Sequence, residues 1–414
     1  MGICFVFARG GFCLFASNST ALLCCLQGNY WREQRRFTLR NLRDFGFGKA
    51  SMESALNEEV QKLIEFMRPK MNQPLSLGKP MSITTLNALW SILTGEKLEL
   101  NDPKLNDTLD AFEKFLRNAE GPTSAVGCLL PFPKLLMIPL VKKLMKIDTL
   151  ELFFNRIFEM LEPLVQSHQS SLDEYNVRDF MDLYLLKIKE TSNPHSSFHS
   201  SRGVNSMKNL LTDLFMAGME TTSSSLAWAF LYLLKNPDCQ SKIWREIQTE
   251  IGMDRLPSLD DKSRMPYTNA FLLEALRSAS LIPLSVFHYT FSDLQIKGFT
   301  IPKDSAIISS LYHVHHDPRF FTEPEQFRPE RFLNQNGQFV NDEHVVPFGI
   351  GKRNCLGKSL GEKQYFLFFV GMLQNFEICP VPGVKLPKTG VEDVHAPGLA
   401  RLVPHYEVIL KPRK

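Results

Sequence analysis

The longest apolar-periodic run in the sequence extends from Met207 to Leu234, and it constrains the fold more than any other feature. At 1.5 Å per residue, this run predicts one helix of roughly 28 residues, about 42 Å long. Similar runs predict helices over Leu56–Met67, Leu150–Val165 and Leu360–Leu373. The sequence from Asn29 onward therefore predicts a mainly α body.

Short strand-like segments cluster late in the chain, at His288–Phe291, Leu294–Ile301 and Ala306–Leu311, with a turn at Gly298. They predict small β-sheets beside the helical mass. The sequence shows neither a parallel βαβ rhythm nor an internal repeat. The expected fold class is mainly α with small β-sheets.

Composition favours one large globular domain. The chain has 414 residues, of which 44% are hydrophobic and 22% charged, and no long linker divides it. The net charge of +3 gives little support to nucleic-acid binding. Residues 3–26 are apolar but broken by Arg9 and by Ser17–Thr20, so they predict a poorly ordered leader rather than a transmembrane helix.

The cysteines show no CxxC pair, which argues against a disulfide framework and favours a reducing compartment. They comprise four near the N-terminus and four single ones, at 4, 13, 24, 25, 128, 239, 355 and 379. The cluster His313–His316 lacks an acid or cysteine at ligand spacing, which argues against zinc.

The stretch "PFGIGKRNCLGK" places Cys355 among glycines and basic residues. A thiolate is a strong ligand for a soft metal, and a single thiolate favours haem. Its glycines allow a tight turn that aims amide groups at the sulfur, and Arg353 suits a haem propionate. The alternative is a glycine-rich loop with an incidental buried cysteine.

The stretch "MAGMETTSSS" interrupts the long helix, where Gly218 alone costs about 1 kcal/mol relative to alanine. Ala217 and Thr221 share one helix face, and Glu220 adjoins Thr221. An acid beside an alcohol in a widened helix groove can hold water and relay protons. The alternative is a helix crossing that needs small residues.

Three further patterns concern charged residues. Glu274 and Arg277 stand at i, i+3 on a predicted helix, and with Arg331 of "FRPERF" they predict either a buried three-member network or an ordinary surface pair. Trp31 and Arg35 form an aromatic and cationic pair suited to a planar anionic cofactor. A basic stripe predicts a solvated helix face or a dock for an acidic partner, and it consists of Arg32, Arg36, Arg40 and Arg43.

Together these motifs resemble the cytochrome P-450 family of haem-thiolate monooxygenases, from about Asn29 to the C-terminus. The segments "SRMPYTNA" and "LQNF" resemble sequences of the animal microsomal branch, most like its second family. The resemblance implies haem as cofactor, with Cys355 as the axial thiolate and metal ligand. It implies proton delivery by Glu220 and Thr221, and a structural triad of Glu274, Arg277 and Arg331. The other implied cofactor-binding residues are Trp31, Arg35, Ala217, His288, Phe348, Arg353 and Gly357.

The resemblance also implies a substrate, partners and a location. The expected pocket is apolar, with Phe215, Ala217, Leu281, Val286 and Leu399, and it fits fatty acids, steroids or foreign lipophiles, with O₂ as co-substrate. An NADPH-dependent flavoprotein reductase, or a cytochrome b-type donor, would supply electrons at the basic stripe, beside Lys352 and Lys358. The segment Leu135–Val141 implies contact with the cytoplasmic face of the endoplasmic reticulum membrane.

The expected division is an unmatched apolar leader at 1–28 and a haem-thiolate monooxygenase domain at 29–414. Because the family's anchor, first helices and sheet strands are not found before Trp31, the resemblance implies an N-terminally truncated chain. Two alternatives follow: an inactive or poorly folded fragment, and a haem-thiolate isomerase or dehydratase. The acid–alcohol pair Glu220–Thr221 argues against the second.

Overall fold

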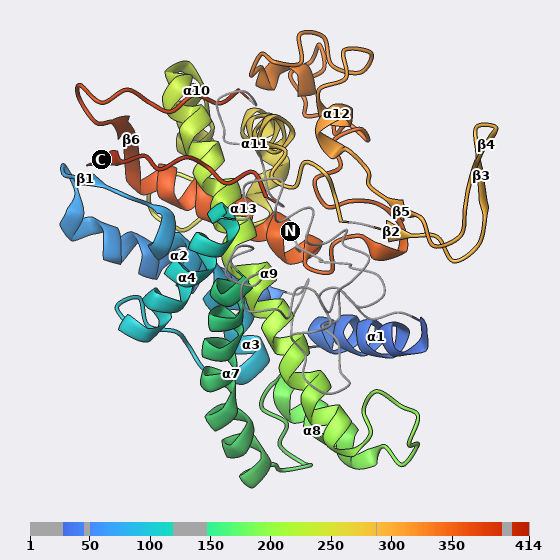
Figure 1. Ribbon diagram of the computed structural model, residues 1–414. Coiled ribbons are helices and arrows are strands. Elements are labelled where there is room, and N and C mark those ends of the chain that lie inside the picture. The colour runs from blue at the N-terminus through green and yellow to red at the C-terminus, as the bar shows by residue number, and fades with distance from the viewer. Residues whose placement is uncertain (1–27, 45–49, 119–146, 287, 391–399, 414) are drawn as a thin grey trace.

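The computed structural model describes residues 28–44, 50–118, 147–286, 288–390 and 400–413 (Figure 1). The leader predicted at 3–26 and the segment Leu135–Val141 lie outside these residues. No helix in the described ranges is both long enough and apolar enough to cross a membrane.

Helices make up most of the described chain, and they confirm the mainly α prediction. The four predicted runs lie within α2, α7, α9 and α13. The α-helices are α1 (Gly28–Asp44), α2 (Ala50–Met67), α3 (Gly78–Thr94), α4 (Pro103–Asn118), α7 (Ile147–Ser170), α8 (Phe180–Glu190), α9 (Ser200–Lys235), α10 (Pro237–Glu250), α11 (Pro266–Ala279), α12 (Leu311–His315) and α13 (Lys358–Asn375). Short 3₁₀ turns are η1 (Arg68–Lys70), η3 (Asp261–Arg264), η4 (Pro329–Phe332) and η5 (Gly351–Arg353).

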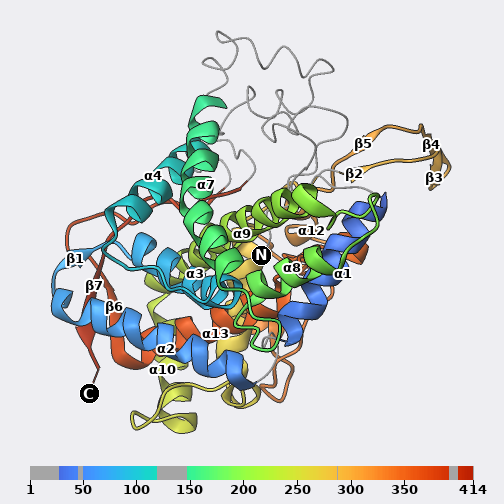
Figure 2. The same cartoon turned by 90° about the horizontal axis from the view of Figure 1, so that it is seen from below.

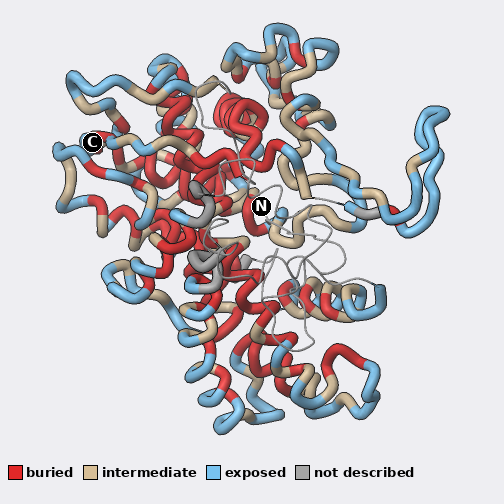
Figure 3. Tube along the Cα trace, in the orientation of Figure 1, coloured by how far each residue is buried: buried red, intermediate tan, exposed pale blue. Residues whose placement is uncertain are grey.

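The long helix α9 passes through the centre of the body, as Figures 1 and 2 show, and α3, α8, α11 and α13 pack against it. Figure 3 shows the chain around it as buried. At Gly218 a Cβ atom would lie 3.0 Å from the Leu89 Cδ2 atom of α3. The glycine therefore lets α3 approach α9 closely, as the helix-crossing interpretation predicted.

The strands form three small antiparallel sheets, also as predicted. They are β1 (Pro74–Leu75), β2 (His288–Tyr289), β3 (Leu294–Ile296), β4 (Phe299–Ile301), β5 (Ala306–Ile307), β6 (Phe376–Pro380) and β7 (Val408–Pro412). The first sheet has the order β1-β7-β6, and the others pair β2 with β5 and β3 with β4. The β3–β4 hairpin turns at Gly298 and projects from the body (Figure 1).

A buried charged cluster joins the end of α7 to the start of α8. His168 contacts the Asp179 carboxylate through Nε2 at 2.8 Å and the Leu164 carbonyl oxygen through Nδ1 at 2.7 Å. Both acceptors require a ring N–H, so the imidazole is protonated on both nitrogens. Asp182 accepts hydrogen bonds from the Arg178 guanidinium at 2.7 and 2.8 Å. Within the described ranges, the side chains of His168, Asp179 and Asp182 lie close enough together to hold a metal ion. The cations of His168 and Arg178 already balance the charge of the two carboxylates.

The pH dependence of stability tests this cluster. The hydrogen bond to Asp179 raises the pKa of His168 above its ordinary value of 6.5. The folded chain therefore keeps a proton that the unfolded chain loses, so the stabilisation is complete below pH 6.5 and is lost as pH rises through the folded pKa. We expect the free energy of unfolding to fall by up to about 1.4 kcal/mol per pH unit in that window.

Urea denaturation between neutral and alkaline pH measures this fall. The variant His168→Gln is expected to lack it, whereas a control variant at the exposed His195, His195→Gln, is expected to keep it. Parallel pH profiles for the wild type and His168→Gln would contradict the assignment.

Candidate active site

A cavity of about 700 Å³ brings together residues from distant parts of the sequence. Its walls include residues of α1, α3, α9, α12, α13, the β2–β5 region and the loop that precedes α13. Its volume is within the range of about 300–1,000 Å³ for small-molecule and cofactor pockets. The sequence-predicted residues that line it are Trp31, Arg35, Ala217, Thr221, Val286, His288, Phe348, Arg353, Cys355 and Gly357.

A tight loop holds the half-buried Cys355 in the cavity wall. The Cys355 backbone N–H donates to the Phe348 carbonyl oxygen at 2.9 Å, which closes the loop. Between them Gly349 and Gly351 have φ values of 66° and 79°, in the left-handed region that favours glycine. A Cβ atom at Gly357 would lie 3.9 Å from the Cys355 Sγ atom. The loop thus offers one thiol, close to small residues, to a group in the cavity.

Cationic side chains lie beside this loop and fit an anionic group. The Arg353 guanidinium lies 3.8 Å from the centroid of the Trp31 ring, and Arg35 lies 5.8 Å from the same centroid. Arg35 also donates to the carbonyl and side-chain oxygens of Asn354, at 2.8 and 3.0 Å, which joins α1 to the cysteine loop. One thiol for iron, with two guanidiniums and His288 for carboxylates, fits haem.

Thr221 and Glu220 of α9 do not share one cavity. Thr221 lines the large cavity, and its hydroxyl donates to the Ala217 carbonyl oxygen at 2.8 Å. Glu220 lines a second cavity instead, where the Ser224 hydroxyl donates to its carboxylate at 2.6 Å. Successive residues of an α-helix point about 100° apart, and α9 is a continuous helix here without the widened turn that the sequence predicted.

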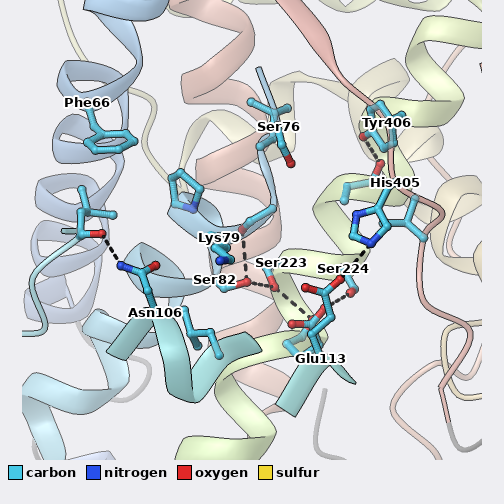
Figure 4. Close-up of a pocket in the computed structure, with 18 of the residues that line it drawn as sticks. Phe66, Ser76, Lys79, Ser82, Asn106, Glu113, Ser223, Ser224, His405 and Tyr406 are labelled. Carbon is cyan, nitrogen blue, oxygen red and sulfur yellow. Dashed lines mark hydrogen bonds and ion pairs between the residues drawn. The ribbon is translucent and has the colours of Figure 1, made fainter. Parts of the chain in front are cut away.

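The second cavity measures about 530 Å³, and both polar and apolar side chains line it (Figure 4). The hydroxyls of Ser82 and Ser223 lie 2.9 Å apart and join α3 to α9. At the other side His405 lies 3.4 Å from the Glu113 carboxylate of α4. Glu220 therefore lines this second cavity, where it contacts the Ser224 hydroxyl, whereas Thr221 lines the cavity that contains Cys355.

Two residues predicted for the pocket, Phe215 and Leu281, are not among the residues that line this cavity. Phe215 is fully buried and packs edge-on against Trp90 at 5.2 Å. Leu281 is also buried and is absent from the cavity walls. Leu399 lies outside the described residues.

The missed apolar residues of the cavity include Leu89, Leu214, Ile282, Leu311 and Val314. Helical spacing was a signal for one of them, since Leu214 is three positions before Ala217 and seven before Thr221 on the same face. The other four lie outside α9, in α3, in α12 and just after α11, so no local pattern relates them to α9.

The three triad residues lie together and contact one another. Arg277 donates through Nε and Nη2 to the Glu274 carboxylate at 2.7 and 2.8 Å, and both side chains are fully buried. Arg331 donates to the same carboxylate at 3.2 Å. The backbone N–H of Arg328 adds a fourth contact at 2.8 Å. Glu274 therefore joins α11 to the η4 turn.

The basic stripe lies on the exposed face of α1. Arg32, Arg36, Arg40 and Arg43 are all exposed, whereas Gln34, Thr38 and Leu42 on the other side are buried. Lys352 and Lys358 of the cysteine-loop region are exposed as well. These cations are available to a partner with an acidic surface.

Comparison with known proteins identifies similar chains. A family model described as cytochrome P-450 matches residues 14–408, and this match begins inside the segment predicted as an unmatched leader. The chain is 33% identical over 365 residues to cytochrome P-450 2L1 of Panulirus argus. It is 35% identical over 360 residues to cytochrome P-450 2U1 of Mus musculus, and 36% identical over 388 residues to cytochrome P-450 2B4 of Oryctolagus cuniculus.

These matches cover most of this chain but less of its relatives. They include 88%, 87% and 92% of this chain, in the same order. The corresponding shares of the relatives are 74%, 66% and 75%. The chain thus spans about two thirds to three quarters of the length of the curated relatives that it matches.

Proposed function

Because the chain belongs to the cytochrome P-450 family and is similar to its second animal family, we propose that it is a haem-dependent monooxygenase. The reaction inserts one atom of O₂ into a lipophilic substrate, and two electrons and two protons reduce the other atom to water. One observation carries the proposal. One cavity, which Thr221 also lines, brings together residues from three separate parts of the sequence: Trp31 and Arg35, His288, and Arg353 and Cys355.

Haem bound through a cysteine thiolate supplies the chemistry of O–O bond cleavage. The chain's own residues hold and orient this group: Cys355 through its sulfur, and Arg35, Arg353 and His288 through charge or hydrogen bonds to carboxylates. The apolar side chains of the cavity, such as Leu214 and Val286, bind an apolar substrate and exclude water.

Proton delivery is the proposed task of α9. The Thr221 hydroxyl lines the cavity but donates to the Ala217 carbonyl oxygen, so it must turn from that acceptor to donate into the cavity. Glu220, in the second cavity, is the proposed source that reloads the hydroxyl, by side-chain rotation or through water. In this proposal the proton source, Glu220, lies in the second cavity, and the apolar substrate binds in the large cavity.

The proposed electron donor is an NADPH-dependent flavoprotein reductase, with a cytochrome b-type protein as the other candidate. The exposed arginines of α1, together with Lys352 and Lys358, offer a basic surface to an acidic donor. The proposed location is the cytoplasmic face of the endoplasmic reticulum membrane. The proposed substrates are fatty acids, steroids or foreign lipophiles, consistent with roles in lipid and xenobiotic metabolism.

Reconstitution tests the proposal against both alternatives. The purified chain is loaded with haem, and its reduced carbon monoxide spectrum is recorded. We expect the red-shifted band of a thiolate complex, and oxygenated products only when NADPH and a reductase are present. An absent band would favour an inactive fragment. Turnover without NADPH and reductase would favour an isomerase or dehydratase.

The variant Thr221→Ala tests the proton relay. We expect it to bind haem and give the thiolate spectrum, because the Thr221 hydroxyl donates to the Ala217 carbonyl oxygen of its own helix and is not a proposed haem ligand. Without the hydroxyl, protons arrive less selectively, so product per NADPH consumed is expected to fall by about tenfold or more while hydrogen peroxide rises. Coupled product and peroxide assays measure this ratio. Equal coupling in the variant Thr221→Ala and the wild type would count against the relay.

A further inference from the structure

His315 lies at the C-terminal end of α12 and is only 1% exposed. Its Nε2 atom accepts a hydrogen bond from the Val346 backbone N–H at 3.0 Å. A backbone N–H can only donate, so Nε2 carries no proton and the neutral ring carries its proton on Nδ1. Nδ1 then donates to the Ser280 Oγ atom at 2.8 Å, and Ser280 donates to the Arg277 carbonyl oxygen at 2.8 Å. The contacts fix one tautomer of the ring.

The backbone of His315 is attached to the same structure. The Arg277 Nη1 atom donates to the His315 carbonyl oxygen at 2.7 Å. His315 therefore contacts the end of α11 twice, once through its ring by way of Ser280 and once through its carbonyl group. Since Arg277 belongs to the buried triad with Glu274, the imidazole is attached to that buried network.

Val346, on the other side of the ring, lies at the start of the cysteine loop. Its carbonyl oxygen accepts from the Gly349 N–H at 3.0 Å, and the neighbouring Phe348 carbonyl oxygen accepts from the Cys355 N–H at 2.9 Å. Val346 itself lines the large cavity. A continuous series of hydrogen bonds thus runs from Arg277 through Ser280, His315 and Val346 to the cysteine loop.

We propose that His315 is a positioning residue that sets the cysteine loop against the buried triad and so places the Cys355 sulfur in the cavity. This inference deepens the proposed function and rests on it to the extent that Cys355 is the haem ligand. His315 does not touch the cavity and acts only through Val346.

The protonation state of His315 supports this role. Burial, with nearby His316 and Arg277, lowers the pKa of His315 to about 3. The ring therefore stays neutral near pH 7, as its contact with the Val346 N–H requires. The nearby His313 is exposed and contacts Ser310 of its own turn, which makes it a matched control.

The test compares His315→Leu, His315→Gln and the control variant His313→Leu in the chain of 414 residues. Leucine removes the acceptor, whereas the glutamine carbonyl group reaches a similar position and restores an acceptor for the Val346 N–H. Three properties are measured: hydrogen exchange at the Val346 amide, the alkylation rate of Cys355 without haem, and the thiolate-bound fraction in the reduced carbon monoxide spectrum.

We expect the His315→Leu change to accelerate exchange at Val346 by about tenfold, as for one lost hydrogen bond. We also expect it to change the alkylation rate of Cys355 severalfold and to reduce the thiolate-bound fraction by at least about half. The His315→Gln change is expected to recover most of each property, and the His313→Leu change to alter none. Should the leucine variant fail to fold, Ser280→Ala, which removes the partner of Nδ1, is expected to give smaller changes of the same kind.

Two results would overturn the inference: exchange at Val346 as slow in the His315→Leu variant as in the control, or faster exchange with an unchanged Cys355. A wild-type chain without a thiolate band would refute the proposed function instead. The exchange and alkylation measurements need no haem, so they still decide the role of His315.

Discussion

Replacement of Cys355 by serine is expected to abolish the thiolate spectrum and reduce oxygenation to background. A serine hydroxyl remains protonated near pH 7 and is a weak ligand for a soft metal, whereas a thiol bound to a metal ionises. The fold is expected to remain, because the loop is closed by the Cys355 backbone N–H and by left-handed glycines rather than by the sulfur. The free energy of unfolding without haem should change by less than about 1 kcal/mol.

The reduced carbon monoxide spectrum and turnover with NADPH and reductase measure this effect. Cys379, a half-buried cysteine on β6, provides the matched control, and Cys379→Ser is expected to keep the spectrum and the activity. A thiolate band that survives in Cys355→Ser would assign the metal ligand to another residue and would refute the proposed site.

The second large effect concerns the buried pair of Glu274 and Arg277. Replacement of Arg277 by methionine preserves much of the side-chain volume but leaves the Glu274 carboxylate, 0% exposed, without two of the four contacts described above. Breaking a buried pair on one side costs about 3–5 kcal/mol, since a desolvated charge is left behind. We expect the variant Arg277→Met to lose that much stability, a large fraction of the 5–15 kcal/mol typical of a folded protein, so partial unfolding is expected.

Guanidinium denaturation of the wild type and variant measures the loss. The matched control is Arg319→Met, because Arg319 pairs with Asp317 but its side chain is 79% exposed. That change should cost much less stability, because exposed ion pairs contribute little. Similar losses in the two variants would show that burial of the triad does not determine its contribution.

Much of the fold could be predicted because its signals are local. Apolar periodicity gave the four long helices and the late strand cluster, since each element is determined by residues a few positions apart. The cysteine loop could be predicted from the sequence for the same reason. Its thiol and its glycines lie within a dozen residues, and two of these glycines, Gly349 and Gly351, have positive φ angles.

The candidate site was predicted less completely because it depends on which way each side chain faces. Glu220 and Thr221 are neighbours in the sequence, yet they line different cavities. Phe215 was chosen for the pocket because it is apolar, but Leu214 lines the cavity while Phe215 packs on Trp90. His315 was considered only as a possible metal ligand, and its contact with Val346 joins residues 31 positions apart.

The sequence by itself determined the chemistry that is possible and the elements that carry it. It specified one cysteine in a glycine-rich loop, a long central helix with an acid beside an alcohol, and three charges suited to a buried network. Only the tertiary structure decided which side chains meet. The rotation of α9 is set by its contacts on all sides, such as the close approach of Leu89 to Gly218. This packing directs Thr221 toward the cysteine cavity and Glu220 away from it, because a helix has one orientation and each of its residues points in a different direction.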